Sequence, residues 1–287
     1  TVMGRFPESV TLNGDILKTE SQIVKLIAER DPISLPWREL DIDIVIESTG
    51  IFRQKSQLEN HLTAGAKKVV LTVPAKDEID YTVVLGVNDQ GLLPEHKIVS
   101  NASCTTNCLA PMAKILNDEF GIELGVINTI HAYTNDQRLA DVPHSDWRRS
   151  RAAAENVIPT TTGAARAVGK VLPELNGKLD GIAMRVPVPD GSVVDFNVRL
   201  RNDVTVDQIN DAVRSAADDG SLKNILDYST LPVVSSDIIG NPHSSIFDAP
   251  FTRVIDGNFI KTLNWYDNEW GYSNRVADLL STLFKLS

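Results

Sequence analysis

The first third of the chain alternates short apolar runs with one stretch of helical periodicity. The run at 43–50, DIVIESTG, is apolar and ends in small residues, which is typical of a buried parallel strand. The segment 55–66 predicts a helix with Gly65 near its C-terminal cap. Further strands are expected at 67–75 and 81–89. Such alternation indicates a parallel sheet with crossovers, in which ligands bind beyond the carboxyl ends of the strands.

The residues before this alternation predict a β-hairpin. Short apolar runs at 9–12 and 15–19 flank Asn13-Gly14, a dipeptide that tolerates positive φ at both positions of a two-residue turn. A third β-branched run covers 22–29 and ends at Asp31-Pro32. We therefore expect strands rather than helices in the first segment.

From Cys104 onward the pattern changes. A helical pattern begins at Cys104 and closes near Gly121; further helices are expected over 207–220 and, amphipathic, over 273–286. Long strand-like runs occupy much of the rest, at 122–133, 181–188, 192–200 and 253–266. The pattern predicts an α/β fold with a parallel sheet, followed by an α+β domain with a largely antiparallel sheet.

Composition narrows the class of protein. The 287 residues are 42% hydrophobic and 23% charged, an ordinary globular balance, and no apolar run reaches the ~18 residues that span a bilayer. The formal net charge of -10 argues against nucleic acid as a main partner. One basic cluster, Arg148, Arg149 and Arg151, predicts ion pairs with the many carboxylates. We expect no membrane partner.

Cysteine and histidine usage excludes several kinds of site. The two cysteines, Cys104 and Cys108, cannot form a disulfide framework or a four-cysteine zinc site, and so few cysteines favour a cytoplasmic protein. The five histidines lack ligand spacing, so no metal site is expected. Cys108, one turn after Cys104, is expected to be a buried structural thiol.

Cys104 is a candidate nucleophile because it opens a helix after a strand-like run. The partial positive charge of a helix N-terminus, together with a nearby imidazole, can lower the pKa of a thiol. His131 follows an apolar run, where it could be a core residue or a base. The stretch that holds it also contains Thr134, Asn135 and Asp136.

Two sets of polar residues suggest a site that binds a phosphate group. Thr160, Thr161, Thr162 and Gly163 precede a helical pattern, which suits either a plain N-terminal cap or a phosphate site. Arg185 could be a structural ion-pair partner or a fork of phosphate donors. A thiol beside such groups points to a phosphorylated carbonyl substrate.

Taken together, these motifs resemble one family: phosphorylating glyceraldehyde-3-phosphate dehydrogenase. The resemblance covers essentially all of the chain. Its longest block is SNASCTTNCLAPMAK at 100–114, and the supporting blocks are HAYTNDQ, VPHSDWRRSRAAAENVIPTTTGAA, MRVPVP and WYDNEWGYSNRV. The family implies a glycolytic oxidoreductase, here with a partial Rossmann-type sheet in 1–103 and 268–287 and a catalytic domain in 104–267.

The resemblance implies a role for each matching residue. Cys104 would attack the aldehyde to give a thiohemiacetal and then a thioester, with His131 as base. NAD would be the cofactor, inorganic phosphate the co-substrate and a homotetramer the assembly, with the loop at about 135–156 near its centre. The implied positions are Thr134 and Arg185 for substrate phosphate; Ser103, Thr105, Thr162 and Gly163 for inorganic phosphate; and Thr49, Gly50, Phe52, Thr72, Asn268 and Tyr272 for the cofactor.

One departure concerns the N-terminal end. Family members begin with a βαβ unit that carries a glycine-rich turn, and no G-x-G-x-x-G occurs in this sequence. The chain starts at Thr1, so we expect a processed or partial chain that binds NAD weakly or not at all and exposes a sheet edge and apolar helix faces. Val142-Pro143 resembles the NAD-preferring form, so NADP is the less favoured cofactor.

Three alternatives stay open at this point. Erythrose-4-phosphate dehydrogenase shares Cys104 and His131, and the segment 241–248 resembles it, although HAYTNDQ and IPTTTGAA favour the glyceraldehyde enzyme. A Cys–His hydrolase fits the chain order Cys104, His131, Asn268 but leaves the phosphate-binding groups without a role. A chain without its N-terminal unit could also be inactive on its own, with a non-catalytic role.

Overall fold

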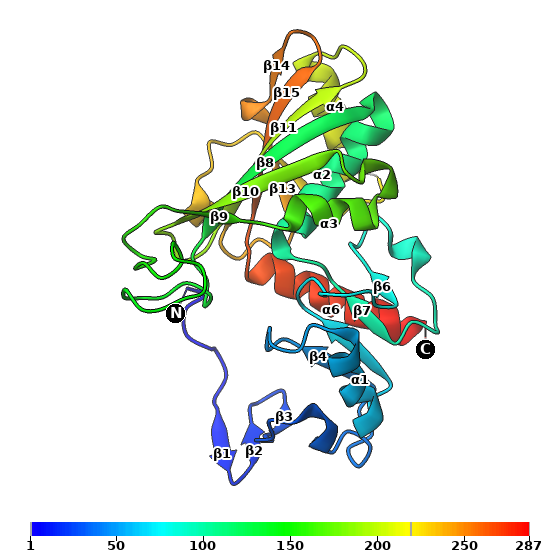
Figure 1. Cartoon of the computed structure of the whole chain (residues 1–287), viewed down its shortest axis with the longest axis vertical. Helices are drawn as coiled ribbons and strands as arrows, with labels where there is room; N and C mark the ends of the chain where they lie inside the picture. The colour runs from blue at the N-terminus through cyan, green and yellow to red at the C-terminus, as the bar shows by residue number, and fades with distance from the viewer. Residues whose placement is uncertain (1, 219, 287) are drawn as a thin grey trace.

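The computed structural model describes residues 2–218 and 220–286 and contains three β-sheets (Figure 1). The largest sheet and its helices form the upper part of the molecule in that view, and the smaller sheets lie below. The described residues leave out Thr1, Asp219 and Ser287, so the outer ends of the expected domain ranges are not described.

The four-stranded sheet has the order β4-β5-β7-β6, and its three pairings are parallel, as expected. Its strands are β4 (Ile44–Glu47), β5 (Lys68–Leu71), β6 (Tyr81–Thr82) and β7 (Ile98–Ser100), with helix α1 (Lys55–Ala64) after β4. The helix ends at Gly65, which adopts φ of 118°, as the sequence predicted. The strand expected over 81–89 is wrong beyond Thr82. There the Asn88 side chain accepts from Val84 N at 2.8 Å, and Gly86 turns the chain with φ of 79°.

Strand β4 lies at the edge of this sheet. Val45 and Glu47 are buried, but Ile46 is 43% exposed, so the strand is buried on one face only. Helix α6 (Trp270–Lys285) runs beside it, and the two line a groove of about 630 Å³. Phe284, at the rim of this groove, is 69% exposed. The expected exposed sheet edge and apolar helix surface are thus both present.

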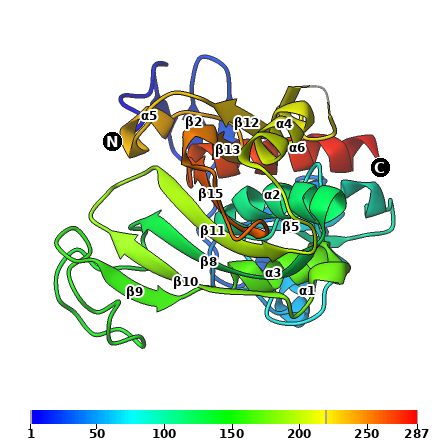
Figure 2. The same ribbon diagram turned by 90° about the horizontal axis from the view of Figure 1, so that it is seen from above.

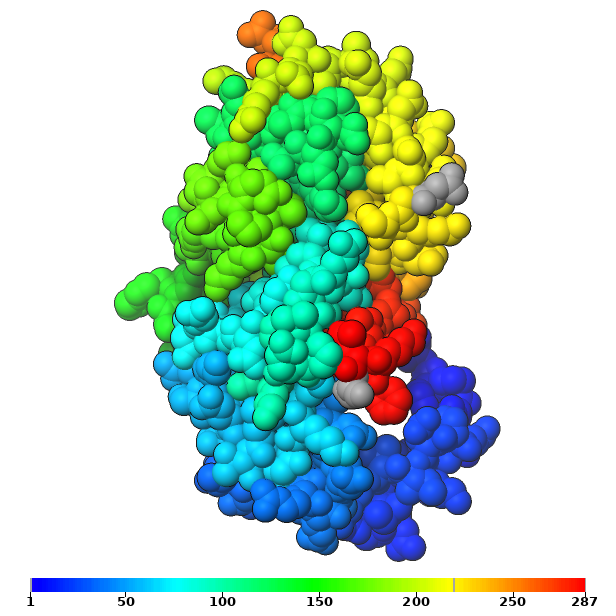
Figure 3. Space-filling model, turned by 90° about the vertical axis from the view of Figure 1, so that its right-hand side faces the viewer, coloured from blue at the N-terminus to red at the C-terminus, as the bar shows by residue number. Residues whose placement is uncertain are grey.

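The N-terminal segment forms a small antiparallel sheet of β1 (Thr11–Asn13), β2 (Ile16–Lys18) and β3 (Ile23–Lys25). The hairpin is confirmed, but its turn lies one residue later than expected. Asn13 pairs with Ile16, so Gly14 and Asp15 are the turn residues, and Gly14 has φ of 61°. Figure 3 shows this segment, in blue, standing away from the C-terminal end of α6, in red.

The eight-stranded sheet has the order β12-β13-β15-β11-β8-β10-β9, and β14 pairs with β15. Its strands are β8 (Ile122–Ala132), β9 (Ile158–Thr161), β10 (Leu179–Val186), β11 (Ser192–Leu200), β12 (Leu226–Ser229), β13 (Ser245–Asp248), β14 (Arg253–Ile255) and β15 (Phe259–Tyr266). Only the β10–β8 and β12–β13 pairings are parallel among the described residues, which confirms a largely antiparallel sheet. The run 253–266 is two strands, because Asp256 and Gly257 turn the chain with positive φ.

Helices cover one face of this sheet (Figure 2). They are α2 (Cys104–Phe120), α3 (Ala164–Val171) and α4 (Val206–Asp218); the short helix α5 (Ser235–Ile238) lies elsewhere. Along β8 the residues facing them are buried, whereas Leu124 and Val126 on the opposite face are 51% and 56% exposed. Met112 of α2 and Phe196 of β11 are fully buried in the core between the layers. The described part of α4 ends at Asp218, short of the expected Gly220.

Candidate active site

Cys104 is the first residue of α2. Ser103 caps the helix, and its hydroxyl accepts from Thr106 N at 3.0 Å, a short-range signal that the sequence carries. Just before it, Ala102 is fully buried with φ of 53°, a conformation that is costly for an L-residue. This turn directs the helix start, and the thiol with it, toward the end of β8.

The structure brings Cys104 and His131 together, although they are 27 positions apart in the sequence. Cys104 Sγ lies 3.5 Å from His131 Nε2. His131 is the second-last residue of β8 and is 3% exposed, with the ring of Tyr266 edge-on at 5.8 Å between centroids. The pair therefore has the geometry for proton transfer from a thiol to a base.

Burial favours the neutral form of both groups. Burial, and then the charge of Arg185, lower the pKa of His131 to about 3. Burial also raises the pKa of the Cys104 thiol, although Arg185 and hydrogen bonds from Thr105 oppose that change. Burial thus opposes a thiolate at Cys104, whereas the charge of Arg185 and the hydrogen bonds from Thr105 favour it.

Arg185 lies directly against the base. It is paired with His131 in the parallel register of β10 and β8. Its Nη1 lies 2.8 Å from His131 Nδ1 and 3.0 Å from Ala132 O, and its buried Nε has no hydrogen-bond partner among the described residues. A cation with an unused donor can bind an anion at this position.

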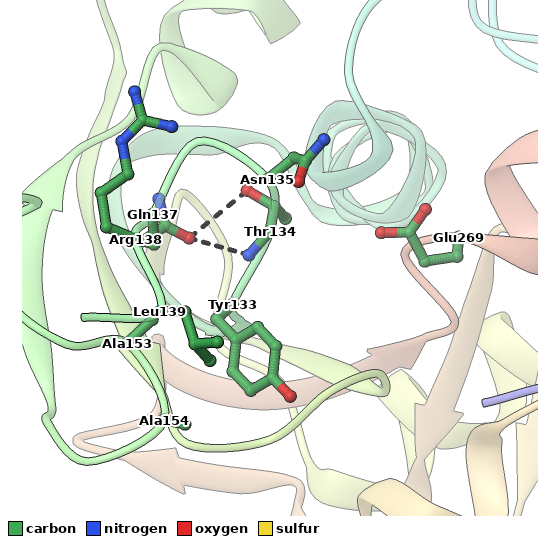
Figure 4. A pocket seen from close by; sticks show the side chains of 9 residues that line it. All are labelled: Tyr133, Thr134, Asn135, Gln137, Arg138, Leu139, Ala153, Ala154 and Glu269. Atoms are coloured by element: carbon green, nitrogen blue, oxygen red, sulfur yellow. Dashed lines mark hydrogen bonds between the residues drawn. The ribbon is translucent and has the colours of Figure 1, made fainter. Parts of the chain in front are cut away.

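Thr134 follows β8 and lines a cavity of about 490 Å³ (Figure 4). Its N–H donates to Gln137 Oε1 at 2.9 Å, and its hydroxyl contacts the same oxygen at 3.3 Å. Figure 4 shows Glu269 across the cavity from this loop, next in the chain to Asn268. Thr134 therefore borders open space, as a ligand-binding hydroxyl must.

The four residues expected at a second phosphate position surround the start of α2 and α3. The Ser103 hydroxyl lies 2.7 Å from that of Thr106, which in turn contacts Ala164 O at the start of α3. Thr162 accepts from Ala164 N at 3.2 Å, and Gly163 is the N-terminal cap of α3. The hydroxyl of Thr105 is different, because it is buried and lies 2.9 Å from Tyr266 OH.

The expected cofactor residues lie at the carboxyl ends of β4 and β5. Thr49 and Gly50 are exposed just after β4, Phe52 is half-buried, and Thr72 follows β5. A parallel sheet binds a dinucleotide at the carboxyl ends of its strands, so the position of these residues is consistent with an NAD site.

Tyr272 and Asn268 complete this set from the other side. The hydroxyl of Tyr272 donates to Thr72 O at 2.7 Å and Ala102 O at 3.1 Å, which places it between the strand ends and Cys104. Asn268 is buried and accepts from the Ser192 hydroxyl at 2.6 Å.

Sequence reasoning missed two buried polar networks. Glu47 contacts His61 Nε2 at 3.0 Å, and Trp37 Nε1 donates to His61 Nδ1 at 3.1 Å, while Glu47 also accepts from Thr49. The network thereby fixes the turn at Thr49. The sequence signal for this network is Glu47, a carboxylate within the apolar run 43–50 that needs a hydrogen-bond partner when buried.

The second network is a pair of carboxyl groups. Asp190 and Asp267 are each 1% exposed and interact with each other, and Asp267 caps the start of α6 by accepting from Trp270 N. Asp267 stands in the block WYDNEWGY, but nothing in the sequence placed Asp190 beside it.

The basic cluster forms ion pairs in part, as expected. Arg149 contacts Asp136 and Asp146, and Arg151 Nε lies 3.2 Å from Asp141. Across residues 2–218 and 220–286 no three His, Cys, Asp or Glu side chains are grouped to hold a metal ion. In the same residues no helix is long and apolar enough to cross a membrane.

Comparisons with known proteins agree with this geometry. Residues 103–268 match the profile of the glyceraldehyde 3-phosphate dehydrogenase C-terminal domain, and residues 1–55 match that of its NAD binding domain. Among curated proteins, the glyceraldehyde-3-phosphate dehydrogenase of Streptomyces coelicolor is 56% identical over 280 residues, which is 97% of this chain and 83% of that protein.

Two further relatives carry the same name. The protein of Mycolicibacterium smegmatis is 55% identical over 287 residues, which cover 99% of this chain and 84% of that protein. The protein of Borreliella burgdorferi is 56% identical over 291 aligned residues, which cover 99% of this chain and 87% of that protein. The expectation of a missing N-terminal unit is not confirmed by these matches. The chain belongs to the glyceraldehyde-3-phosphate dehydrogenase family, the NAD-dependent oxidoreductases of glycolysis.

Proposed function

We propose that this chain oxidises and phosphorylates glyceraldehyde 3-phosphate to 1,3-bisphosphoglycerate, with Cys104 as nucleophile and His131 as base. The observation that carries the proposal is the 3.5 Å contact between Cys104 Sγ and His131 Nε2 at the start of a capped helix. Bound NAD supplies the hydride acceptor. Inorganic phosphate is the co-substrate.

The protein's own groups act in sequence. The Cys104 sulfur bonds to the aldehyde carbon while its proton passes to His131 Nε2, and the Cys104 N–H at the helix start faces the developing oxyanion. His131 returns this proton to the oxyanion, which becomes the hemiacetal hydroxyl and leaves Nε2 free again. His131 then takes the proton of the hemiacetal hydroxyl as the carbon is oxidised to a thioester. Attack by inorganic phosphate on the thioester carbon breaks the C–S bond and returns the thiol.

We assign the two phosphate sites from the positions of their residues in the structure. Thr134 and Arg185 bind the substrate phosphate. The cavity supports the assignment of Thr134, and Arg185 Nε, which is buried without a partner among the described residues, supports that of Arg185. Ser103, Thr105, Thr162 and Gly163 bind the attacking phosphate, although the hydroxyl of Thr105 must leave Tyr266 to do so.

We assign Thr49, Gly50 and Phe52 to the adenosine side of the cofactor, and Thr72, Asn268 and Tyr272 to its nicotinamide side. The contact of Tyr272 with Thr72 O supports counting the residues from 268 onward with 1–103 as the NAD-binding domain. Residues 104–267 form the catalytic domain.

We propose a cytoplasmic homotetramer. Support comes from apolar side chains exposed on the loop after β8, where Leu139 is 85% and Trp147 89% exposed. The bare apolar face of β8, with Leu124 and Val126, offers a second contact surface. Sedimentation of the purified chain tests the assembly.

The activity test measures NADH formation with the aldehyde, NAD and phosphate, leaving out one component at a time. We expect turnover that needs all three. Preference for erythrose 4-phosphate, or NADH formation independent of phosphate, would contradict the proposal. Thioester formation without any NADH would instead indicate a hydrolase.

A further inference from the structure

Three buried hydroxyl groups form a chain that ends at the nucleophilic sulfur. The hydroxyl of Tyr266 lies 2.9 Å from that of Thr105 and 2.9 Å from that of Thr129, and all three residues are shielded from solvent. Thr105 follows Cys104 in the first turn of α2, and its hydroxyl and its N–H form hydrogen bonds that favour the Cys104 thiolate. This hydroxyl chain therefore runs from Thr129 in β8 through Tyr266 in β15 to the start of α2.

The two ends of the hydroxyl chain decide the direction of its hydrogen bonds. Each hydroxyl has one hydrogen to donate, and a thiolate can only accept. The Thr129 hydroxyl has no hydrogen-bond partner besides Tyr266 among the described residues, so its hydrogen is satisfied only when Tyr266 accepts it. Tyr266 must then donate to Thr105, and Thr105 to the sulfur. Any other arrangement leaves the buried Thr129 hydrogen without an acceptor, which costs free energy.

The ring and the hydroxyl of Tyr266 make separate contacts. The ring lies edge-on to that of His131, with 5.8 Å between the centroids. Among the described residues the hydroxyl bonds to the two threonines and not to Cys104 itself. A phenylalanine at this position keeps the contact with His131 and removes the hydroxyl. The effect of the hydroxyl chain can therefore be separated from that of the ring.

Several charged or titratable groups act on the Cys104 sulfur. They are His131 from β8, Arg185 from β10, Tyr266 from β15, Glu269 just before α6, Tyr272 from α6 and Cys108 from α2 itself. Arg185 favours the thiolate, and Glu269 opposes it. Burial raises the pKa of Tyr266, so its hydroxyl is uncharged where the thiol titrates. Removing that hydroxyl thus changes a hydrogen bond and no charge near the sulfur.

We propose that Tyr266 is a positioning residue for the nucleophile, because its hydroxyl, fixed by Thr129, turns the Thr105 hydrogen toward the Cys104 sulfur and so favours the thiolate. This rests on the proposed function, in which Cys104 is the nucleophile. Hydrogen bonds that follow one another in a chain polarise and strengthen each other, so the last donor binds an anion better than an isolated hydroxyl does. Tyr266 acts through Thr105 and touches neither substrate nor cofactor.

The test is the pH dependence of Cys104 alkylation by iodoacetamide in sodium chloride without phosphate, because the proposed phosphate site includes Thr105. Cys104→Ala measures any labelling of the buried Cys108. We expect Tyr266→Phe to move the midpoint to higher pH by about half a unit, roughly a threefold slower reaction below the midpoint. An unchanged or lower midpoint overturns the proposal.

Tyr228→Phe is the matched control, because it removes a tyrosine hydroxyl of the same sheet that contacts Arg214 rather than the hydroxyl chain. Its midpoint should equal that of the unchanged protein, and an equal rise in both variants overturns the proposal. Thr129→Val disturbs the far end of the chain and leaves Tyr266 in place. It should raise the midpoint by less than Tyr266→Phe, since Tyr266 can still donate to Thr105; a lowered midpoint contradicts the chain.

A double-mutant cycle shows whether Tyr266 acts through Thr105. In Thr105→Val the midpoint should already be raised, and adding Tyr266→Phe should raise it no further. In Thr105→Ser, which keeps the hydroxyl, Tyr266→Phe should still raise it. A further rise in the Thr105→Val background would mean another route to the sulfur and overturns the proposal.

These measurements use neither NAD nor an aldehyde. A chain without dehydrogenase activity can therefore still show the effect of Tyr266 on Cys104, and an active enzyme can lack it. Failure of this inference and failure of the proposed function are thus distinguishable.

Discussion

The two cysteines of α2 are one turn apart but differ in surroundings. Cys104 is half-buried at the helix start, 3.5 Å from His131 Nε2. Cys108 is fully buried against Ser245 and the Asn264 carbonyl, and burial raises the pKa of its thiol. Position on the helix, rather than residue type, decides which sulfur can react.

Replacing Cys104 by Ser should reduce dehydrogenase turnover by a factor on the order of 10⁴ or more, because a hydroxyl at this site forms no comparable anion. The initial rate of NADH formation measures the effect. Cys108→Ser is the matched control and should keep most of the turnover, since it changes a sulfur with no path to substrate. Turnover retained in Cys104→Ser would remove this residue from the mechanism.

Asp190 makes stability depend on pH. Burial, followed by Asp267 and Glu269, raises the pKa of its carboxyl to about 6, and its Oδ2 is buried without a hydrogen-bond partner in the described part of the chain. Because the folded state binds this proton more tightly than the unfolded state, its contribution is present at low pH and is lost as pH rises through about 6. The fold therefore carries a repulsion between Asp190 and Asp267 at neutral pH.

The change Asp190→Asn should remove that repulsion, because the amide can donate a hydrogen bond where the carboxyl shared its proton. We expect the free energy of unfolding, relative to the unchanged protein, to increase by on the order of 2 kcal/mol between about pH 4.5 and about pH 8. Urea unfolding at the two pH values measures this difference. A constant difference would mean that Asp190 does not titrate in this range.

Among single residues, the sequence singled out Cys104 and His131 as candidates because a helix start and a strand end are local patterns. The contact between Arg185 and His131 is not local. It depends on the parallel register of β8 and β10, which are separated along the chain by β9 and α3. The same holds for Tyr266, whose hydroxyl lies between Thr105 and Thr129.

Among the elements, helices were predicted better than strand lengths. Helices α1 and α2 have caps that stand in the sequence, at Gly65 and Ser103. The strand expected at 81–89 fails after Thr82, because the Asn88 side chain holds a turn that apolar periodicity cannot reveal. The run 253–266 likewise hides a turn at Asp256 and Gly257.

Gly65 couples α1 to the chain before β4. A Cβ there would lie 2.6 Å from Arg38 Cα, and the residue has φ of 118°. Gly177 has φ of 77° but nothing within 4 Å of such a Cβ. The two positions share the left-handed backbone and differ in available space.

We therefore expect Gly177→Ala to lower the free energy of unfolding by about 1 kcal/mol and Gly65→Ala to lower it by about 2 kcal/mol or more. The extra loss at Gly65 reflects displacement of backbone, which cannot rotate away. Urea unfolding of both variants gives the comparison. Equal losses would show that the close approach to Arg38 relaxes without cost.

Across the whole molecule, Tyr272 connects the two larger sheets. It lies on α6, and its hydroxyl donates to Thr72 O after β5 and lies 3.1 Å from Ala102 O before α2. Because both acceptors are backbone carbonyls, the hydrogen bond does not depend on the chemistry of the side chains at those positions. Apolar periodicity gave no sign of it, although it sets how the parallel sheet meets the catalytic helix.

Tyr272→Phe should lower the free energy of unfolding by about 1–2 kcal/mol, since it removes the one hydroxyl hydrogen that lies near Thr72 O and Ala102 O. Tyr228→Phe is the control: its hydroxyl meets the exposed Arg214, and its loss should cost about 0.5 kcal/mol. Both are measured by urea unfolding. Equal effects would mean that the two sheets do not depend on this hydroxyl.

Trp147, 89% exposed on the loop after β8, also gives the protein an optical label of its own. An indole in water emits at long wavelength and is quenched by iodide through collisions. An indole covered by a neighbouring subunit emits at shorter wavelength and is protected from iodide. If the loop lies inside the proposed tetramer, dilution should shift the emission to the red and restore quenching. The midpoint of that change gives the assembly constant without any added dye, and Trp147→Phe supplies the blank.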